Sequence, residues 1–525
     1  MTRSLTEGFR VNTIIRKRMA ARKRRLARRL DKFNYPDDLD RPMLRAGNIQ
    51  YELAARAVGT CCGGIGLIHQ LVRALGLARA IDRRLHLFKF HLPYHESDHV
   101  LNLAYNALCG GACLEDLELR RGDEAYLNAL GASRIPDPTT AGDFCRRFAR
   151  EDLQDLQAAF DEARLKVWAR QPQGFFACAR IDADGTLVET GAECKQGVDL
   201  SYKGMWGYHP LVLTLAGTGE VLRLLNRSGN RPSHEGAAEL FDQSIALCRQ
   251  AGFRKIVLRG DTDFSQTTHL DRWHEAGDVR FIFGMDCTPA LHIRADDLED
   301  SAWKPLERPP KYTVKTKPRA RPGRFKQQIV EARQFKDIRL VDEWVAEMPY
   351  RPYACKQTYR LIVVRKNLVV NEPRQGRLFD DYRYFFYITN EQPKLTPAEI
   401  VFEANDRCHQ ENHLAQLYSA RALYAPVDNL LSNEAYMLMT SLAWNLKAWL
   451  ALWLAEGPGR WHKRQATEKQ TLLKLEFRTF VNHWMRIPCQ VLSTGRKVVL
   501  RLLAYNPWQE VFFRLAEQLS RPLRC

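Results

Sequence analysis

The chain has 525 residues, of which 45% are hydrophobic and 27% charged, and this balance predicts a globular protein with about two to four domains. Its formal net charge of +18 at pH 7 favours a polyanionic partner, because clustered lysine and arginine side chains gain affinity by releasing the counterions of phosphates. An acidic membrane surface is the rival partner.

The 13 cysteines are scattered along the sequence. Neither Cys61-Cys62 nor Cys109-x-x-x-Cys113 is completed by a second pair at the spacing of a zinc site. We interpret them as reduced thiols in the core of a cytosolic protein, with a metal or disulfide role as the alternative. No secretory signal is expected, because charges interrupt the first apolar residues.

Residues 1–48 are predicted to form a basic N-terminal arm, with dense runs of lysine and arginine at 16–18 and 22–29. Such an arm can lie along DNA phosphates without reading the base sequence. A solvated terminus and a transit peptide have a similar composition and are the alternatives.

Residues 49–172 show a helical pattern. After a proline-containing turn, Thr139 or Thr140 is predicted to cap a helix that carries Arg146 and Arg147. A short helix with exposed arginines beside an aromatic face can enter a DNA groove as a recognition helix. A charged helical face that is merely solvated is the alternative interpretation.

Two strands of a predicted core at 173–286 end in acidic residues. The first runs into Asp182 and Asp184, and the second is followed by Asp261 and Asp263. Further strands and a helix between them fit a mixed sheet covered by helices. Carboxylates at strand ends suit a hard cation such as Mg²⁺, although aspartate after a strand is also common turn chemistry.

A third acid falls on a predicted helix. The stretch 396–399 has a capping threonine and a proline at the first helical position, so a helix should begin there. Carried forward, this helix puts Ala404, Arg407, Glu411 and Tyr418 on one face, and Glu411 is expected to point toward the strands. Two aspartates and this glutamate could hold two divalent ions, which activate an attacking oxygen and stabilise a leaving oxygen in phosphodiester chemistry.

The character of the sequence changes at 287–390, where we predict a mainly β insertion. Strand-like runs occur at 359–365 and 382–388, around a basic segment at 309–324 that prolines make unsuited to a helix.

Residues 391–456 are predicted to form the closing helices of the core. Their long apolar run is expected to be a buried helix and not a membrane span, because Asn445 and Lys447 lie near its middle. A basic C-terminal region, 457–525, follows, with a predicted hairpin around Thr494.

At these acids the sequence resembles the transposases of bacterial insertion sequences with an RNase H-like core, the group labelled Transposase DDE domain group 1. The resemblance rests on three runs, which are Asp184-Gly185-Thr186, Arg259-Gly260-Asp261-Thr262-Asp263-Phe264, and Arg407-x-x-x-Glu411-Asn412 followed by Ser441-Leu442-Ala443-Trp444-Asn445-Leu446. It implies an α/β protein whose RNase H-like core is a mixed sheet flanked by helices. The β insertion would interrupt this core, and a helical DNA-binding region would precede it.

The resemblance implies a catalytic triad of Asp184, Asp261 and Glu411. These residues would also be the ligands of Mg²⁺, for which Mn²⁺ is expected to substitute. Asp182 and Asp263 are the alternatives within the two aspartate pairs.

Two positions depart from the family pattern. Relatives with an extended signature carry a tyrosine three residues before the arginine and a lysine seven after the glutamate, both associated with DNA phosphates. Here these positions are Ala404 and Tyr418. Arg407 is expected to contact DNA, and Arg421 could supply the missing positive charge.

The implied function is a DNA transposase that cuts the ends of an insertion sequence and joins them to target DNA. Its partners would be double-stranded DNA, as terminal inverted repeats and target, and a second copy of the chain, because pairing two ends favours a homodimer. No membrane partner is expected, and the protein would act at the nucleoid in the bacterial cytoplasm. The alternatives are a nuclease that only hydrolyses and a DNA-binding protein derived from a transposase that has lost catalysis.

Overall fold

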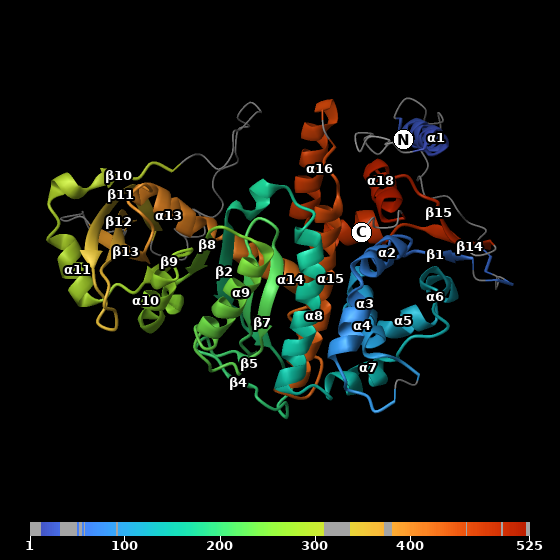
Figure 1. The fold of residues 1–525 in the computed structure, drawn as a ribbon, viewed down its shortest axis with the longest axis horizontal. Helices are drawn as coiled ribbons and strands as arrows, with labels where there is room; N and C mark the ends of the chain where they lie inside the picture. Colours follow the sequence, from blue (N-terminus) through green and yellow to red (C-terminus); the bar gives the residue numbers. More distant parts are fainter. Residues whose placement is uncertain are drawn as a thin grey trace. The chain divides into compact units, whose positions relative to one another are not determined.

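The structure is a computed structural model that describes residues 12–31, 50–51, 55–56, 58–90, 93–308, 337–371, 381–457, 459–494 and 497–520. The chain forms two compact units (Figure 1). Unit 1 draws on Met1–Phe175, Thr186–Arg231 and Asn412–Cys525, and unit 2 on Phe176–Gly185 and Pro232–Glu411. The six-part division expected from the sequence stays a prediction.

Unit 2 is built on a mixed sheet. Its strands, in spatial order, are β10 (Lys304–Pro305), β11 (Asp337–Tyr350), β12 (Tyr359–Asn371), β13 (Asp381–Thr389), β9 (Val279–Met285), β8 (Ile256–Gly260) and β2 (Ala179–Gly185). The pairs β2–β8 and β8–β9 are parallel, whereas β13 pairs with β9 in the antiparallel sense. The strands predicted at 359–365 and 382–388 are therefore confirmed, and they continue the same sheet as β8 and β9.

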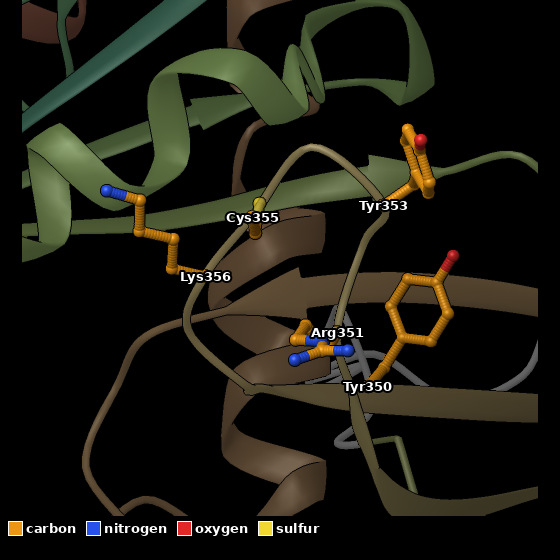
Figure 2. Close-up of a pocket in the computed structure, with 5 residues that line it drawn as sticks. All are labelled: Tyr350, Arg351, Tyr353, Cys355 and Lys356. Atoms are coloured by element: carbon orange, nitrogen blue, oxygen red, sulfur yellow. The ribbon is translucent and has the colours of Figure 1, made fainter.

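The turn between β11 and β12 borders an open depression with a volume of about 640 Å³. Figure 2 shows its lining residues, which are Tyr350, Arg351, Tyr353, Cys355 and Lys356. None of the predicted acids lines it. The basic segment predicted at 309–324 lies outside the described residues.

Helices cover the sheet of unit 2. They are α9 (Ala237–Ala251), α10 (Thr267–Glu275), α11 (Pro289–Asp296) and α13 (Pro397–Asp406), with short turns η3 (Thr262–Phe264) and η4 (Asp300–Ala302). Ile400 and Val401 of α13 pack into a buried cluster with apolar side chains of β8, β9, β11 and β12. Thr396 caps α13 and forms a capping box with Glu399, as predicted.

The prediction of one helix from 396 to Tyr418 is wrong. The helix α13 ends at Asp406, and a second helix, α14 (His409–Ser419), follows. At the break, the N–H groups of Arg407, Cys408 and Gln410 bond to carbonyls only three residues back, so the i to i−4 series is interrupted. Neither proline nor glycine occurs at this position, so no local feature of the sequence predicts the helix break.

Unit 1 is mainly helical. Its helices are α1 (Thr13–Leu30), α2 (Ile65–Leu75), α3 (Leu77–Arg84), α4 (Glu96–Leu108), α5 (Leu117–Arg121), α6 (Glu124–Leu130), α7 (Pro138–Cys145), α8 (Arg150–Trp168), α15 (Leu430–Trp453), α16 (His462–Lys474), α17 (Phe477–Phe480) and α18 (Gln509–Leu519), with a π-turn η6 (Val481–Met485). Helix α15 packs against α4, α8 and α16 and is buried from Ser432 to its end. The prediction of a buried core helix is confirmed. Among the described residues, no helix is both long and apolar enough to cross a membrane.

Three small β elements complete unit 1. An antiparallel hairpin joins β6 (Leu211–Leu215) and β7 (Glu220–Leu225), β5 (Trp206–Tyr208) pairs with β3 (Val188–Glu189) and β4 (Asp199–Leu200), and β14 (Cys489–Thr494) pairs with β1 (Gly59–Thr60) and β15 (Lys497–Leu502). The hairpin predicted around Thr494 is thus confirmed.

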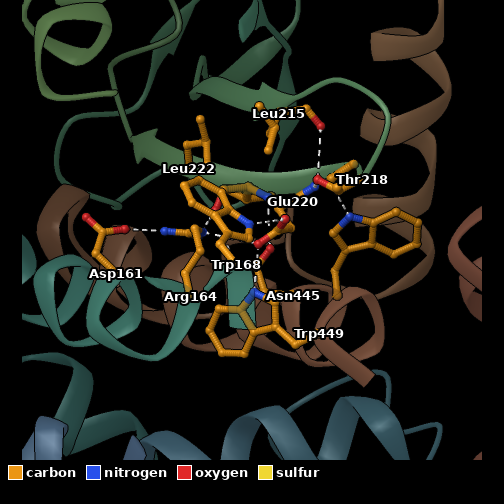
Figure 3. A network of polar contacts seen from close by, with 12 residues as sticks. Asp161, Arg164, Trp168, Leu215, Thr218, Glu220, Leu222, Asn445 and Trp449 are labelled. Carbon is orange, nitrogen blue, oxygen red and sulfur yellow. Dashed lines mark hydrogen bonds and ion pairs between the residues drawn. The ribbon is translucent and has the colours of Figure 1, made fainter. Parts of the chain in front are cut away.

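A buried polar network joins β7 to the helices of unit 1 (Figure 3). The fully buried carboxylate of Glu220 accepts hydrogen bonds from the indoles of Trp449 (2.7 Å) and Trp168 (3.0 Å) and from Arg164 Nε (3.3 Å). Asn445 of α15 pairs with both backbone groups of Val221, at 2.8 and 3.1 Å. Polar groups buried in this way are stable only when they are satisfied, so the network fixes α8 and α15 against β7.

Candidate active site

Three predicted acids lie within unit 2, on different elements. Asp184 is near the end of β2, Asp261 follows β8 directly, and Glu411 lies in the first turn of α14. Because β2 and β8 are parallel, with Asp182 opposite Arg259, their carboxyl ends meet at one edge of the sheet. The strands therefore bring Asp184 and Asp261 to the same edge.

The turn after β8 is tightly built. A Cβ atom at Gly260 would lie 2.5 Å from the Cβ of Phe264, so this close approach requires a glycine. Asp261 caps the turn η3, and its Oδ1 accepts a hydrogen bond of 3.1 Å from the Asp263 backbone N–H. The glycine and the cap together fix the direction of the Asp261 side chain.

The charges of Asp261 and Glu411 both act on the carboxyl group of Asp184. The pKa of Asp184 is raised to about 7, mainly by burial and in part by the charges of Asp261 and Glu411, while the charge of Arg407 opposes the rise. The pKa of Asp261 is also raised, first by burial and then by Asp263, while Arg407 again lowers it. The pKa values of both aspartates are therefore raised above the ordinary value for this side chain.

Arg407 lies beside these acids. It is the C-cap of α13, and its Nη1 is 3.7 Å from Asp184 Oδ2. The helix break at this position separates it from α14, which carries Glu411. Arg407 offsets part of the repulsion between the carboxylates. Ala404, three residues earlier, packs against the apolar cluster under α13.

The alternative acids have different surroundings. Asp182 is fully buried and accepts two hydrogen bonds from Arg259, at 2.6 Å to Nε and 2.9 Å to Nη2. Asp263 is exposed. The assignment of the triad within each pair stays a prediction, but a buried bidentate arginine contact occupies Asp182.

Arg259 is a residue whose role the sequence analysis missed. Its side chain is fully buried on β8, and besides Asp182 it contacts the Glu403 backbone carbonyl (2.8 Å) and the Asp406 carboxylate (3.5 Å) of α13. Arg259 thus ties the end of α13 to β2 and β8. The signal was present in the sequence, because an arginine within an apolar strand needs a buried partner.

The donor set fits a hard divalent cation. Carboxylate oxygens are the ligands that Mg²⁺ prefers, and a cation would offset the charges of Asp261 and Glu411, which contribute after burial to the raised pKa of Asp184. Within the described ranges, however, no three His, Cys, Asp or Glu side chains converge closely enough to hold a metal ion. Metal binding would have to draw the three carboxylates together and displace Arg407 from Asp184.

The other predicted DNA contacts lie in unit 1. A helix follows the proline-containing turn as predicted, but Asp137 caps this helix, α7, in place of Thr139 or Thr140. Because α7 ends at Cys145 and α8 begins at Arg150, Arg146 and Arg147 lie between the two helices and not within one. Arg146 is bound in ion pairs with Asp143 (2.7 Å) and Asp428 (2.9 Å). These partners compete with any phosphate for Arg146.

Arg147 and Arg421 are exposed. The Arg147 guanidinium lies 5.2 Å from the centre of the Phe88 ring. Arg421 has a positive φ of 57°, just after α14, and its backbone N–H bonds to the Tyr418 carbonyl at 3.0 Å. Their predicted contact with DNA is not tested by this geometry.

Tyr418 stands where relatives carry a lysine. Its hydroxyl donates to the Leu187 carbonyl and accepts from the Thr186 hydroxyl at 3.0 Å, all within unit 1. The tyrosine hydroxyl therefore bonds to the 186–187 segment of unit 1.

Comparison with known proteins identifies the class of the chain. The model of the family described as Transposase DDE domain group 1 matches residues 49–523. The chain belongs to this family of DDE transposases. No curated protein matched the sequence.

One solved structure that resembles the chain is a cryo-EM structure of a piggyBac transposase synaptic complex with hairpin DNA. Its sequence is 8% identical to that of this chain, and its TM-score is 0.34. The alignment covers 82% of this chain and 84% of that chain. A likeness at this level carries no argument about the site.

Proposed function

We propose that the protein cuts the ends of a bacterial insertion sequence and joins them to target DNA, with Asp184, Asp261 and Glu411 as its catalytic acids. The observation that carries the proposal is the environment of Asp184, whose pKa burial and the two other acids raise to about 7. A carboxyl group with a strongly raised pKa at the carboxyl end of a strand, beside a second carboxylate, is typical of functional sites. In this proposal the mixed sheet of unit 2 belongs to an RNase H-like core.

The three acids would hold Mg²⁺, with Mn²⁺ as a substitute. Bound there, the metal would supply Lewis acidity for phosphodiester hydrolysis and for the attack of a 3′-hydroxyl on target DNA. The residues of the chain set up this chemistry. Asp184 must lose its proton to act as a ligand, and Arg407, released from Asp184, is close enough to the site to contact a DNA phosphate.

Arg259 and Asp182 act as positioning residues in this proposal. Their bidentate contact joins β8 to β2 two residues before Asp184 and Asp261, and Arg259 also contacts the end of α13. Two copies of the chain would pair the two element ends at the bacterial nucleoid, as a homodimer on double-stranded DNA.

The test uses the full chain and a labelled duplex that ends in the element's own terminal repeat, with Mg²⁺ or with EDTA. We expect cleavage at the repeat boundary that requires Mg²⁺ and is lost in Glu411→Gln and Asp184→Asn. Asp263→Asn is the matched control, since this exposed acid belongs to the same turn as Asp261 and should not be needed.

Each other outcome has a distinct meaning. Binding of the repeat without cleavage, under conditions that allow two ends to pair, would identify a DNA-binding protein that has lost catalysis. Cleavage without joined products on an added target duplex would identify a nuclease that only hydrolyses. Loss of cleavage in Asp263→Asn with retention in an Asp261→Asn variant would move the second acid by two positions.

A further inference from the structure

The N-terminal helix α1 (Thr13–Leu30) is the most strongly charged element that the structure describes. It carries nine lysine and arginine residues and no acidic residue, namely Arg16, Lys17, Arg18, Arg22, Lys23, Arg24, Arg25, Arg28 and Arg29. It also precedes residue 49, at which the match to the transposase family begins. The family resemblance therefore gives α1 no role.

The helix is poorly stabilised by its own chain. None of its residues is buried, and its first turn holds no acid to complement the helix dipole. Like charges four residues apart, such as Arg24 with Arg28 and Arg25 with Arg29, repel one another on its surface. A helix of this composition gains stability from a partner that supplies negative charge.

Contacts to the rest of unit 1 occupy one narrow side of α1. Ile15, Met19 and Arg22 are half-buried there, and Arg22 Nη1 donates a hydrogen bond of 2.7 Å to the Leu502 carbonyl of β15. Arg16 Nη2 lies 3.8 Å from Glu510 Oε1. The other basic side chains of α1 are exposed, and none of them forms an ion pair with another described residue.

The charged side of α1 points away from this contact. Successive residues turn by about 100° around a helix, so Arg24 and Arg28 lie on the side opposite Met19, whereas Arg25 and Arg29 lie on its flank, where both are exposed. A helix that binds a lipid surface would present its apolar stripe outward. In α1 the half-buried Ile15 and Met19 of that stripe face the protein, so a membrane is the less suitable partner.

We propose that α1 is a sequence-independent binding element for the phosphate backbone of double-stranded DNA. The inference rests on the proposed function for the presence of DNA and adds a surface outside the matched family region. Because its side chains are long cations without a base-reading geometry fixed by packing, α1 would contact phosphates and not bases. Such a surface suits target DNA of any sequence, whereas terminal repeats need sequence recognition elsewhere.

The test measures the binding of the full chain to a labelled duplex of arbitrary sequence, in EDTA, by fluorescence anisotropy over a range of salt concentrations. The variant replaces Arg24, Arg25, Arg28 and Arg29 by glutamine. Each lost phosphate contact should reduce the steepness of log affinity against log salt by about 0.9, so loss of all four contacts should reduce it by about 3.6, with an affinity at least tenfold lower at low salt. The matched control replaces the same four residues by lysine and should keep the slope, because lysine also binds phosphate as a point charge.

Protection from trypsin gives an independent readout. Trypsin cleaves after lysine and arginine, and the duplex should slow cleavage within α1, while vesicles rich in anionic lipid should not. An unchanged slope in the glutamine variant, or an equal loss in the lysine variant, would overturn the inference. So would protection by vesicles alone, which would identify a membrane-binding helix.

The inference and the proposed function fail separately. If the glutamine variant lowers the slope and the unaltered protein does not cleave a terminal repeat, only the proposed catalysis is wrong. If cleavage requires Mg²⁺ and Glu411 but the slope does not change, only the role of α1 is wrong.

Discussion

Asp182 and Asp184 are two residues apart, and substitution of each by asparagine should change stability in opposite directions. Asp182 is fully buried and neutralises Arg259, whose side chain is also fully buried. Removing one partner of a buried ion pair costs about 3–5 kcal/mol, because the other charge is left unpaired. The contacts of Arg259 with Glu403 and Asp406 remain, so we expect Asp182→Asn to lose about 3 kcal/mol.

Burial raises the pKa of both aspartates, but Asp184 should behave differently because it lacks the bidentate arginine contact that compensates Asp182. Its pKa rises from the ordinary 3.8 to about 7, which at neutral pH corresponds to a destabilisation of at most about 4 kcal/mol. Asp184→Asn removes this charge and also the ion pair with Arg407, so we expect a net gain of about 1–2 kcal/mol. The variant should nevertheless lose cleavage of the element end, since asparagine is a weaker ligand for a divalent cation.

The effect of Asp184 on the free energy of unfolding should depend on pH, because its pKa differs between the folded and unfolded states. Between pH 4 and 7 the folded protein binds more protons at Asp184 than the unfolded chain does, so this carboxyl group lowers stability progressively as the pH rises toward 7. The gain in Asp184→Asn should therefore be largest at pH 7 and above and disappear near pH 4. Urea unfolding followed by tryptophan fluorescence, at several pH values, measures it.

Two results would refute this reasoning. Equal destabilisation by both substitutions would mean that Asp184 is as firmly paired as Asp182. A neutral Asp182→Asn combined with a loss of cleavage would mean that Asp182, and not Asp184, is the acid of the site.

Three further predictions concern buried or bonded groups of unit 1. Burial lowers the pKa of Lys447 to about 7, so the free energy of unfolding should rise with pH between about 7 and 10.5, by at most about 5 kcal/mol. Urea unfolding of Lys447→Met should show no such rise with pH. Glu220→Ala should lower the free energy of unfolding by about 3–5 kcal/mol, because the Arg164 and two indole N–H groups that bond to Glu220 lose this acceptor while buried. Glu220→Gln should lower the free energy of unfolding by less, measured in the same denaturation assay. Tyr418→Phe should lower the melting temperature slightly, for a loss of about 1 kcal/mol, because it removes the hydroxyl that donates to the Leu187 carbonyl, and an unchanged melting temperature would contradict that contact.

Local signals in the sequence predicted the strands that carry the aspartates and the start of α13, but not the separate helix α14 that carries Glu411. The capping threonine and proline set the start of α13, an apolar run bounded by Asp182 and Asp184 gave β2, and another gave β8 before Asp261. Polar residues near the middle of α15 excluded a membrane span. Each of these features depends on residues that are neighbours along the chain, so propensity and capping are sufficient to predict it.

Features that depend on distant residues could not be predicted in this way. Only the tertiary structure separates Asp182 from Asp184, because the difference lies in the buried Arg259, 77 positions away. The break between α13 and α14 has no local signal, and the pairing of β13 with β9 unites segments that the sequence presents as separate. The sequence alone determined which acids can form a site, through residue type and strand ends. Packing decided which aspartate is paired with Arg259 and where Arg407 lies, and burial raises the pKa of both aspartates. These effects exist only once distant segments of the chain meet.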